Sequence, residues 1–342
     1  MREVLKGGKY MKIIQKLMII LTIGLTLSIL IVFMTTSNAV ESDKATLIRF
    51  GHGAAESNER HLAVMKFKEL VEEKSAGTMK VQVYPNEQLG SEAEMIESVT
   101  FNDLQMVAAS AFSQYDQRIS VFELPYLFDS YEEAWGALDG EIGEQVAAPL
   151  LEDGLRVVAY FENGFRHVTS NVPIENPEDL SGLKIRTPEF PLSVSTFKAF
   201  GSNPTPMAFG ELYMALQQGT VDAQENPIAN IYASKFNEIQ DYLNLTGHQY
   251  MPLPVAISEE FWQTLTPEEQ EIINSSAREA GQFHRDILRK NEEEMLTKLQ
   301  EAGMTVIQPD REKFREKTES VYTSYKKKFG EDFVNNILKA VE

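Results

Sequence analysis

Two polar side chains follow short predicted strands in the middle of the chain. Residues 183–186 alternate apolar and basic side chains and are stopped by Pro188, so Arg186 lies near the carboxyl end of a strand. A second brief strand over residues 221–224 leads into Glu225-Asn226-Pro227, which predicts Asn226 as an N-cap and Pro227 as the first residue of the next helix. Because strand carboxyl ends in open α/β sheets face the ligand crevice, we expect Arg186 and Asn226 to converge there.

The chemistry offered by these two residues is recognition of an acid. A guanidinium presents a rigid fork that matches a carboxylate, which a lysine cannot imitate, whereas an amide both donates and accepts hydrogen bonds. A surface or inter-lobe ion pair is the alternative role for Arg186. A simple helix cap is the alternative for Asn226.

The elements that must position these residues alternate between strand and helix. In the first part of the chain we expect strands at 46–51, 79–84 and 106–109 and helices at 58–74 and 92–100. Around Arg186 we expect helices at 194–200 and 211–218 and an extended segment at 204–206. This alternation is typical of a doubly wound α/β fold.

Two further stretches have a simple structural reading. Residues 124–128, Leu-Pro-Tyr-Leu-Phe, are apolar and predict a crossover packed in the core. Residues 267–299 form a long run of helix formers that either bridges two lobes as one helix or breaks at Gly281. A last strand at 305–307 and terminal helices at 310–341 complete the prediction.

Composition excludes several classes of protein. The chain of 342 residues has 32 basic and 51 acidic side chains, a net charge of −19, which argues against binding to nucleic acid or anionic membranes. It has no cysteine, so disulfides, thiolate metal sites, a thiol nucleophile and lipid attachment as a bacterial lipoprotein are all excluded. An anionic ligand must therefore be met by a few locally placed cations.

The first residues predict export. Lys6, Lys9, Lys12 and Lys16 precede an uncharged apolar run over residues 17–34, and Ser37-Asn38-Ala39 follows as a small-x-small cleavage site. We expect residues 1–39 to be a signal peptide, which places the mature protein outside the cytoplasm. The apolar run is long for a signal peptide, so an uncleaved membrane anchor is the alternative.

Ordered sequence blocks resemble one family. The chain resembles the substrate-binding proteins of TRAP transporters, the DctP family, in three blocks: GLKIRTPE, NPTPMAFGELYMALQQGTVDAQENP and LTGHQY. Four further blocks extend the resemblance from about residue 47 onward: FGHGAAESNERH, YPNEQLGSE, LPYLF and NGFRHVTSN. The resemblance implies an α/β fold like that of periplasmic binding proteins, with two interleaved lobes and a long connecting helix. The lobe ranges that we predict are 45–162 with 252–290, and 163–251 with 291–342.

The resemblance also assigns roles in ligand binding. It makes Arg186 the clamp for a ligand carboxylate, Arg166 of NGFR a second arginine at the ligand, with Asn163 beside it, and Asn226 a ligand contact. Phe209 supplies an apolar wall. The structural alternatives are a lobe-crossing salt bridge for Arg166 and core packing for Phe209.

Other polar residues have weaker assignments. His52 follows the first strand, where a residue facing the cleft is expected; His52 and His61 could suggest a metal, but the spacing of a metal site is missing. Glu92 begins a predicted helix, where the helix dipole favours a carboxylate, and a hydroxyl contact to a sugar-like ligand is its second role. Tyr250 and His248 lie near the second predicted crossing between lobes, where either hinge packing or a cleft contact fits.

These predictions describe a receptor. We expect it to capture a small organic acid between two lobes and deliver it to the membrane permease subunits of a TRAP transporter, as a monomer without cofactor, metal or nucleic acid. A hexuronate is the first choice of ligand and a C4-dicarboxylate or other organic acid the second. A secreted enzyme is the rival class, but the chain has no G-x-S-x-G elbow, no thiol and no metal spacing. A sensor ectodomain is a third possibility if the N-terminal segment stays uncleaved.

Overall fold

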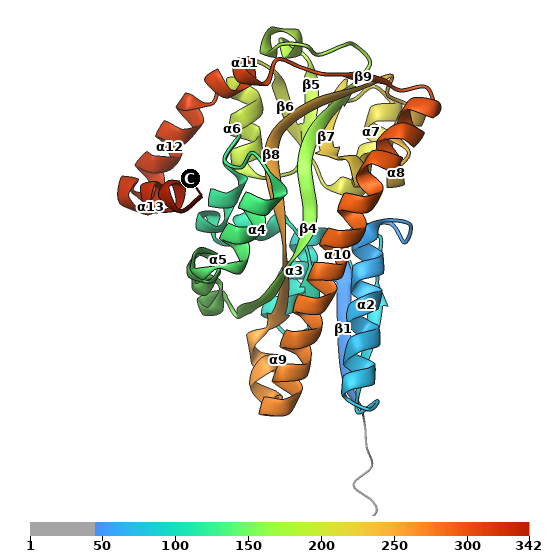
Figure 1. Cartoon of the computed structure of the whole chain (residues 1–342), viewed down its shortest axis with the longest axis vertical. Coiled ribbons are helices and arrows are strands. Elements are labelled where there is room, and N and C mark those ends of the chain that lie inside the picture. Colours follow the sequence, from blue (N-terminus) through green and yellow to red (C-terminus); the bar gives the residue numbers. More distant parts are fainter. Residues whose placement is uncertain (1–44, 342) are drawn as a thin grey trace, which may run out of the picture. The chain divides into compact units, whose positions relative to one another are not determined.

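One mixed sheet of nine strands runs through the chain in a computed structural model that describes residues 45–341 (Figure 1). Its strand order is β2-β1-β3-β8-β4-β7-β5-β6, and β9 pairs with β8 outside this path. The predicted signal peptide or anchor lies outside the described residues. Among the helices that the structure describes, none combines the length and apolar character that crossing a membrane requires.

The first lobe is built from β1 to β3 and the helices between them. Strands β1 (Thr46–His52), β2 (Met79–Tyr84) and β3 (Met106–Ala108) are parallel, and helices α2 (Glu59–Lys74) and α3 (Glu92–Thr100) connect them. Asn58 caps α2, and Ser91 caps α3 in a capping box with Glu94, so both helices begin where the sequence predicts.

The second lobe repeats this strand-and-helix alternation. Strands β5 (Lys184–Thr187), β6 (Asn203–Pro206) and β7 (Ala223–Pro227) are parallel, and helices α6 (Pro191–Ala199), α7 (Leu212–Gln217) and α8 (Ile228–Ala233) accompany them. Arg186 pairs with Gln224 in the register of β5 and β7. The adjacent carboxyl ends of these two strands therefore carry Arg186 and Asn226 to the same edge, as predicted.

Two long strands join the lobes. β4 (Leu155–Ser170) and β8 (Tyr242–Ser258) pair with each other in antiparallel fashion, while β8 also pairs with β3 and β4 also pairs with β7 (Figure 1). Register shifts interrupt the β4–β8 ladder between Val157 and Ala159, Glu162 and Gly164, and Arg166 and Val168. A bulge bends its strand and increases the local twist, so these shifts bend the two strands where they pass from one lobe to the other.

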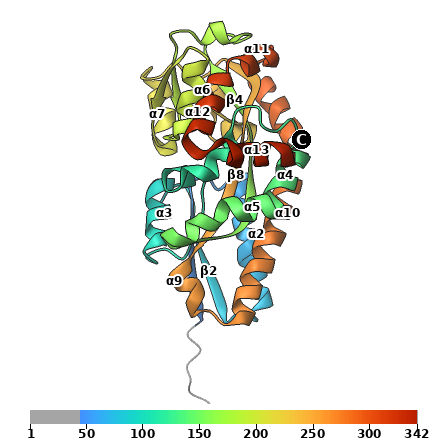
Figure 2. The same ribbon diagram turned by 90° about the vertical axis from the view of Figure 1, so that its left-hand side faces the viewer.

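A helix of 35 residues, α10 (Pro267–Glu301), runs along both lobes (Figures 1 and 2). Thr266 caps it in a capping box with Glu269, and its buried side chains recur at helical spacing, for example Ile273, Ala277 and Ala280. The helix does not break at Gly281. The Cβ of an alanine there would lie 3.0 Å from the Tyr160 carbonyl oxygen, so this glycine lets the helix approach strand β4 closely.

The remaining elements pack beside the two long strands and against neighbouring helices. Short helices α4 (Tyr131–Asp139), α5 (Glu141–Ala147) and α9 (Glu259–Thr264) pack beside the hinge strands, followed by β9 (Thr305–Ile307), α11 (Arg311–Glu316), α12 (Glu319–Phe329) and α13 (Glu331–Val341). Leu124, Tyr126 and Phe128 are buried, which confirms the predicted core crossover.

Two local predictions are wrong. Strand β7 continues through Asn226 to Pro227, and Pro227 is the N-cap residue of α8, so Asn226 caps no helix. Pairing of His167 with Asn226 across β4 and β7 holds this segment extended beyond the predicted end. Helix α6 begins at Pro191 rather than Val194 because proline, with its fixed φ, fits the first helical position.

Candidate functional site

A cavity opens between the two lobes where the parallel strands end. It measures about 600 Å³, counting the part that is open to solvent. The first lobe supplies walls from the segments after β1, β2 and β3, and the second lobe supplies the segments after β5, β6 and β7. Charged and amide side chains dominate the polar part of the lining: Arg60, Glu87, Glu92, Asn163, Arg166, Arg186, Glu189, Asn226 and Asn230.

Arg186 is a buried cation at this cavity. Its side chain is 2% exposed, and its Nε and Nη2 donate to the Met207 carbonyl oxygen at 3.1 and 2.7 Å. No carboxylate of the described residues forms an ion pair with it, although it has three further N–H groups to donate. Burial lowers the pKa of Arg186 to about 10, a measure of how much water the guanidinium has lost.

Arg166 is committed to another partner. Its Nε and Nη2 donate to the two carboxylate oxygens of Glu225 on the neighbouring strand β7, the second at 2.9 Å, and Nη2 also reaches the Glu225 carbonyl at 2.7 Å. The predicted alternative of a lobe-crossing salt bridge is wrong in its geometry, because both strands belong to the adjacent β4–β7 ladder. The charge that Arg166 brings to the cavity is therefore neutralised by Glu225.

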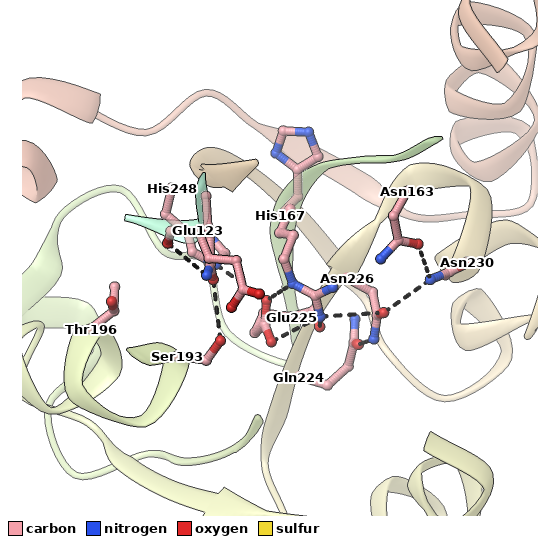
Figure 3. A network of polar contacts seen from close by, with 12 residues as sticks. Glu123, Asn163, His167, Ser193, Thr196, Gln224, Glu225, Asn226, Asn230 and His248 are labelled. Atoms are coloured by element: carbon pink, nitrogen blue, oxygen red, sulfur yellow. Dashed lines mark hydrogen bonds and ion pairs between the residues drawn. The ribbon is translucent and has the colours of Figure 1, made fainter. Parts of the chain in front are cut away.

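Glu225 is held ionised within a polar network (Figure 3). His248 Nε2 lies 3.2 Å from its Oε2, and His248 Nδ1 lies 2.8 Å from Thr246 Oγ1. Burial opposes the charge of Glu225, but the charge of Arg166 and the hydrogen bond from His248 keep the pKa of the carboxyl below its ordinary range. Burial lowers the pKa of His248, so its imidazole is neutral and donates from Nε2.

Three asparagines line the middle of the cavity. Asn163 is the extra residue of a bulge in β4, and Gly164 behind it adopts φ +100°, a conformation that glycine tolerates. Asn230 Nδ2 lies 3.3 Å from Asn226 Oδ1 and 3.4 Å from Asn163 Oδ1, and Asn226 Nδ2 donates to Gln224 Oε1 at 2.6 Å (Figure 3). These neutral amides suit hydroxyl groups of a ligand, because they both donate and accept.

Glu92 is the first residue of α3 and faces the cavity wall. Its Oε1 accepts from Arg60 Nη1 at 2.6 Å, while its Oε2 accepts from the Ser110 backbone N–H at 2.7 Å and from Ser110 Oγ at 2.8 Å. Arg60 Nη2 in turn donates to Asn163 at 2.9 Å. Glu92 therefore begins the helix as predicted and also fixes the wall of the site, with its charge balanced by Arg60.

The structure brings most of the predicted site residues together. Six of them line the cavity: Arg186, Arg166, Asn226, Asn163, Glu92 and Phe209. The centre of the Phe209 ring lies 5.9 Å from the Arg186 guanidinium carbon. Phe209 also packs against the core of the second lobe, so its two predicted roles coexist.

His52 and Tyr250 lie outside the lining. His52 is fully buried, with Nε2 3.1 Å from His61 Nδ1 and with Nδ1 accepting from the Ala54 N–H at 3.2 Å. The Tyr250 hydroxyl donates to Glu162 at 3.0 Å, and its ring packs on Phe128 and Phe165 in the hinge. A direct ligand contact for either residue stays a prediction.

Sequence reasoning missed several residues of the cavity, among them Arg60, Glu87, Glu189 and Asn230. Arg60 and Glu87 lie within the blocks SNERH and YPNEQLG, so the sequence signal was present without an assigned role. Asn230 follows Asn226 by four residues, but Asn226 lies within strand β7, so helical spacing alone does not predict their contact.

A family profile matches most of the chain. Residues 50–328 match bacterial extracellular solute-binding protein, family 7, also called DctP. The 2,3-diketo-L-gulonate-binding periplasmic protein YiaO of Escherichia coli K12 is 38% identical over 289 residues, which cover 84% of this chain and 87% of that protein. The C4-dicarboxylate-binding protein DctB of Bacillus subtilis 168 is 31% identical and covers 86% of each chain.

The fold is also similar to solved structures. The sugar acid binding protein DctPAm of Advenella mimigardefordensis, crystallised with galactonate, is 35% identical and superimposes with a TM-score of 0.84 over 87% of this chain and 98% of that one. The similarity extends through both lobes, so the two-lobed fold is that of the solute-binding proteins of TRAP transporters.

Proposed function

Since the chain belongs to the bacterial extracellular solute-binding proteins of family 7, we propose that it is the receptor of a TRAP transporter that captures a sugar acid with one carboxylate. The finer proposal is a hexuronate, glucuronate or galacturonate. One relative is named as a 2,3-diketo-L-gulonate-binding protein, and two similar solved structures hold galactonate and L-gulonate. Those ligands share a six-carbon acid with several hydroxyls, which is also the chemistry of a hexuronate.

The observation that carries the proposal is the state of Arg186. It is the buried cation of the described cavity that has no carboxylate partner, and its remaining N–H groups can take a ligand carboxylate in a fork. Asn163, Asn226 and Asn230 lie along the same cavity and match the hydroxyls of the ligand. Closure of the lobes would exclude water and strengthen each of these contacts.

A panel of acids tests the proposal. We expect galacturonate or glucuronate to raise the melting temperature, because a ligand at 100 times its Kd adds about 2.7 kcal/mol of stability. Galactonate, L-gulonate, succinate and uncharged galactose complete the panel, and titration calorimetry gives the affinities. Equal affinity for galacturonate and galactose would remove the carboxylate clamp, and recovery of unchanged ligand after binding separates a receptor from an enzyme.

A C4-dicarboxylate is the second candidate ligand. The 31% identity with a C4-dicarboxylate-binding protein favours it. Succinate binding at least tenfold tighter than any sugar acid in the panel would establish it in place of the hexuronate.

We also propose that the receptor is exported and delivers its ligand to membrane permease subunits. The basic and apolar segment ending in Ser37-Asn38-Ala39 supports removal of residues 1–39. We expect the intact mass of protein recovered from the native host to begin after Ala39. A membrane-bound species that retains residues 17–34 would show an anchor instead.

A further inference from the structure

Glu87 joins the two lobes at the mouth of the cavity. It follows β2 in a turn where Asn86 and Glu87 both have positive φ, 55° and 54°. Its Oε2 accepts a hydrogen bond of 3.0 Å from the backbone N–H of Gly210, which follows β6 in the second lobe. A left-handed backbone at a glutamate is uncommon, so this turn holds the side chain in a specific direction.

Among the described lining residues, the charges outside ion pairs are one cation, Arg186, and two carboxylates, Glu87 and the exposed Glu189. Arg166 is paired with Glu225 and Arg60 with Glu92, so these pairs contribute little net charge to the cavity. Arg186 keeps its positive charge for a ligand. In the cavity lining Glu87 already offsets part of the charge of Arg186, so one ligand carboxylate completes the balance and a second would meet net negative charge.

We infer that Glu87 is a specificity-determining residue, which closes the cavity through Gly210 and rejects acids that carry a second carboxylate. This inference rests on the proposed function as a sugar-acid receptor. Carboxylates close together in a partly desolvated cavity repel each other, which discriminates a dianion from a monoanion. The Arg186 fork thus selects ligands that carry a carboxylate, and the charge of Glu87 selects against ligands that carry two.

The titration of Glu87 makes this selection dependent on pH. Burial and, to a smaller extent, the Glu92 carboxylate on α3 raise the pKa of Glu87 to about 7, even though the Gly210 N–H, Arg186 on β5 and Arg60 on α2 act to lower it. Glu87 is therefore charged above pH 7 and protonated below it. The preference for a monoanion is expected to grow as the pH rises from 6 to 8.

The test compares galacturonate with galactarate, which carries a second carboxylate at the other end of the same carbon chain. In the parent protein at pH 8 we expect galacturonate to bind at least tenfold more tightly than galactarate. Glu87→Gln keeps an oxygen acceptor for the Gly210 N–H and nearly the same volume, but removes the charge. We expect this variant to reduce the galacturonate-to-galactarate affinity ratio about tenfold and to abolish the change of that ratio between pH 6 and pH 8.

Glu73→Gln is the matched control, because Glu73 is an exposed glutamate of α2 outside the cavity. It should leave the ratio within twofold of the parent at both pH values. An unchanged ratio in Glu87→Gln, with galacturonate still bound, would overturn the inference while leaving the proposed function intact. Failure of the parent protein to bind any acid of the panel would overturn both.

Discussion

Arg186 keeps its positive charge in a place where water has largely been removed. Two of its three nitrogens already donate to the Met207 carbonyl, so a ligand carboxylate bound in a fork would take the remaining N–H groups of Nη1 and Nη2. We expect Arg186→Lys to weaken binding of the acid about 30-fold, since an imperfectly paired buried charge costs about 2 kcal/mol at the low end of measured values. Arg186→Ala should weaken it further.

Titration calorimetry measures these affinities, and circular dichroism without ligand checks the fold. Both variants should remain folded, because Arg186 makes no ion pair that its removal would break. Binding by the lysine variant within twofold of the parent would show that Arg186 acts only as a diffuse charge.

Arg166 should behave differently from Arg186. Its guanidinium holds the fully buried Glu225 through two parallel contacts, so Arg166→Ala leaves a buried carboxylate without its cation. Removing one partner of a buried pair costs about 3–5 kcal/mol of unfolding free energy. We expect this loss in urea denaturation without ligand, together with weaker binding. An Arg166→Ala protein as stable as the parent would show that the pair contributes nothing to the fold.

Helix α10 gives a prediction at the scale of an element. Alanine favours a helix over glycine by up to about 1 kcal/mol, but at position 281 its Cβ would lie 3.0 Å from the Tyr160 carbonyl oxygen. At this point strand β4 is held by its ladder with β8, in which Tyr160 pairs with Pro254. Overpacking of this kind costs about 1–3 kcal/mol, so we expect Gly281→Ala to lower the unfolding free energy by about 1 kcal/mol net.

Thermal or urea unfolding measures this effect. Gly136→Ala in helix α4 is a suitable control, because nothing lies within 4 Å of the Cβ that it adds. The control should be neutral or slightly stabilising. A Gly281→Ala protein that is more stable than the parent would mean that α10 can move away from β4.

The elements also show how far sequence patterns reach. Period and capping signals are local, so they located β2, α3 and β9 at their observed ends. Asn226 shows the limit, because a local reading of Asn before Pro predicts a cap, whereas pairing with β4 keeps the residue in a strand. Partners distant in sequence decide such cases.

The site residues show the same difference between what local patterns predict and what distant contacts decide. Arg186 and Asn226 were found because strand ends can be read locally and because the surrounding blocks resemble a family. The pairing of Arg60 with Glu92 and of Glu87 with Gly210 joins residues 32 and 123 positions apart, which no periodicity encodes. Likewise the commitment of Arg166 to Glu225 follows only from the β4–β7 register.

At the scale of the whole molecule, buried titratable groups set the dependence of stability on pH. Burial lowers the pKa of His52, His167 and His284 to about 3, whereas an unfolded histidine titrates near 6.5. Below pH 6.5 the unfolded chain therefore binds protons that the folded chain does not. The unfolding free energy consequently falls as the pH falls.

Buried carboxyls act in the opposite direction. Burial raises the pKa of Glu123 to about 8 and that of Glu162 to about 7, against about 4.5 in an unfolded chain. Between pH 4.5 and 8 the folded chain keeps protons that the unfolded chain releases, so stability falls as the pH rises. Each net proton changes the unfolding free energy by about 1.4 kcal/mol per pH unit.

The two effects predict a maximum of stability between about pH 5 and 6.5. Urea denaturation without ligand at pH 4, 6 and 8 should give the highest midpoint at pH 6. Glu123→Gln mimics the protonated carboxyl, so it should reduce the loss between pH 6 and 8. A stability that rises steadily from pH 4 to pH 8 would contradict this account.

The order of the strands has a consequence for synthesis of the chain. The edge of β3 and the length of β4 are covered by β8, which begins at Tyr242, after 241 of the 342 residues. Helix α10, which packs along both lobes, comes later still. The sheet of neither lobe can therefore be completed before about the first two-thirds of the chain have been synthesised. The newborn polypeptide therefore stays incompletely folded until β8 has been synthesised. Under the export proposed above, machinery that accepts unfolded chains would have that interval in which to engage it.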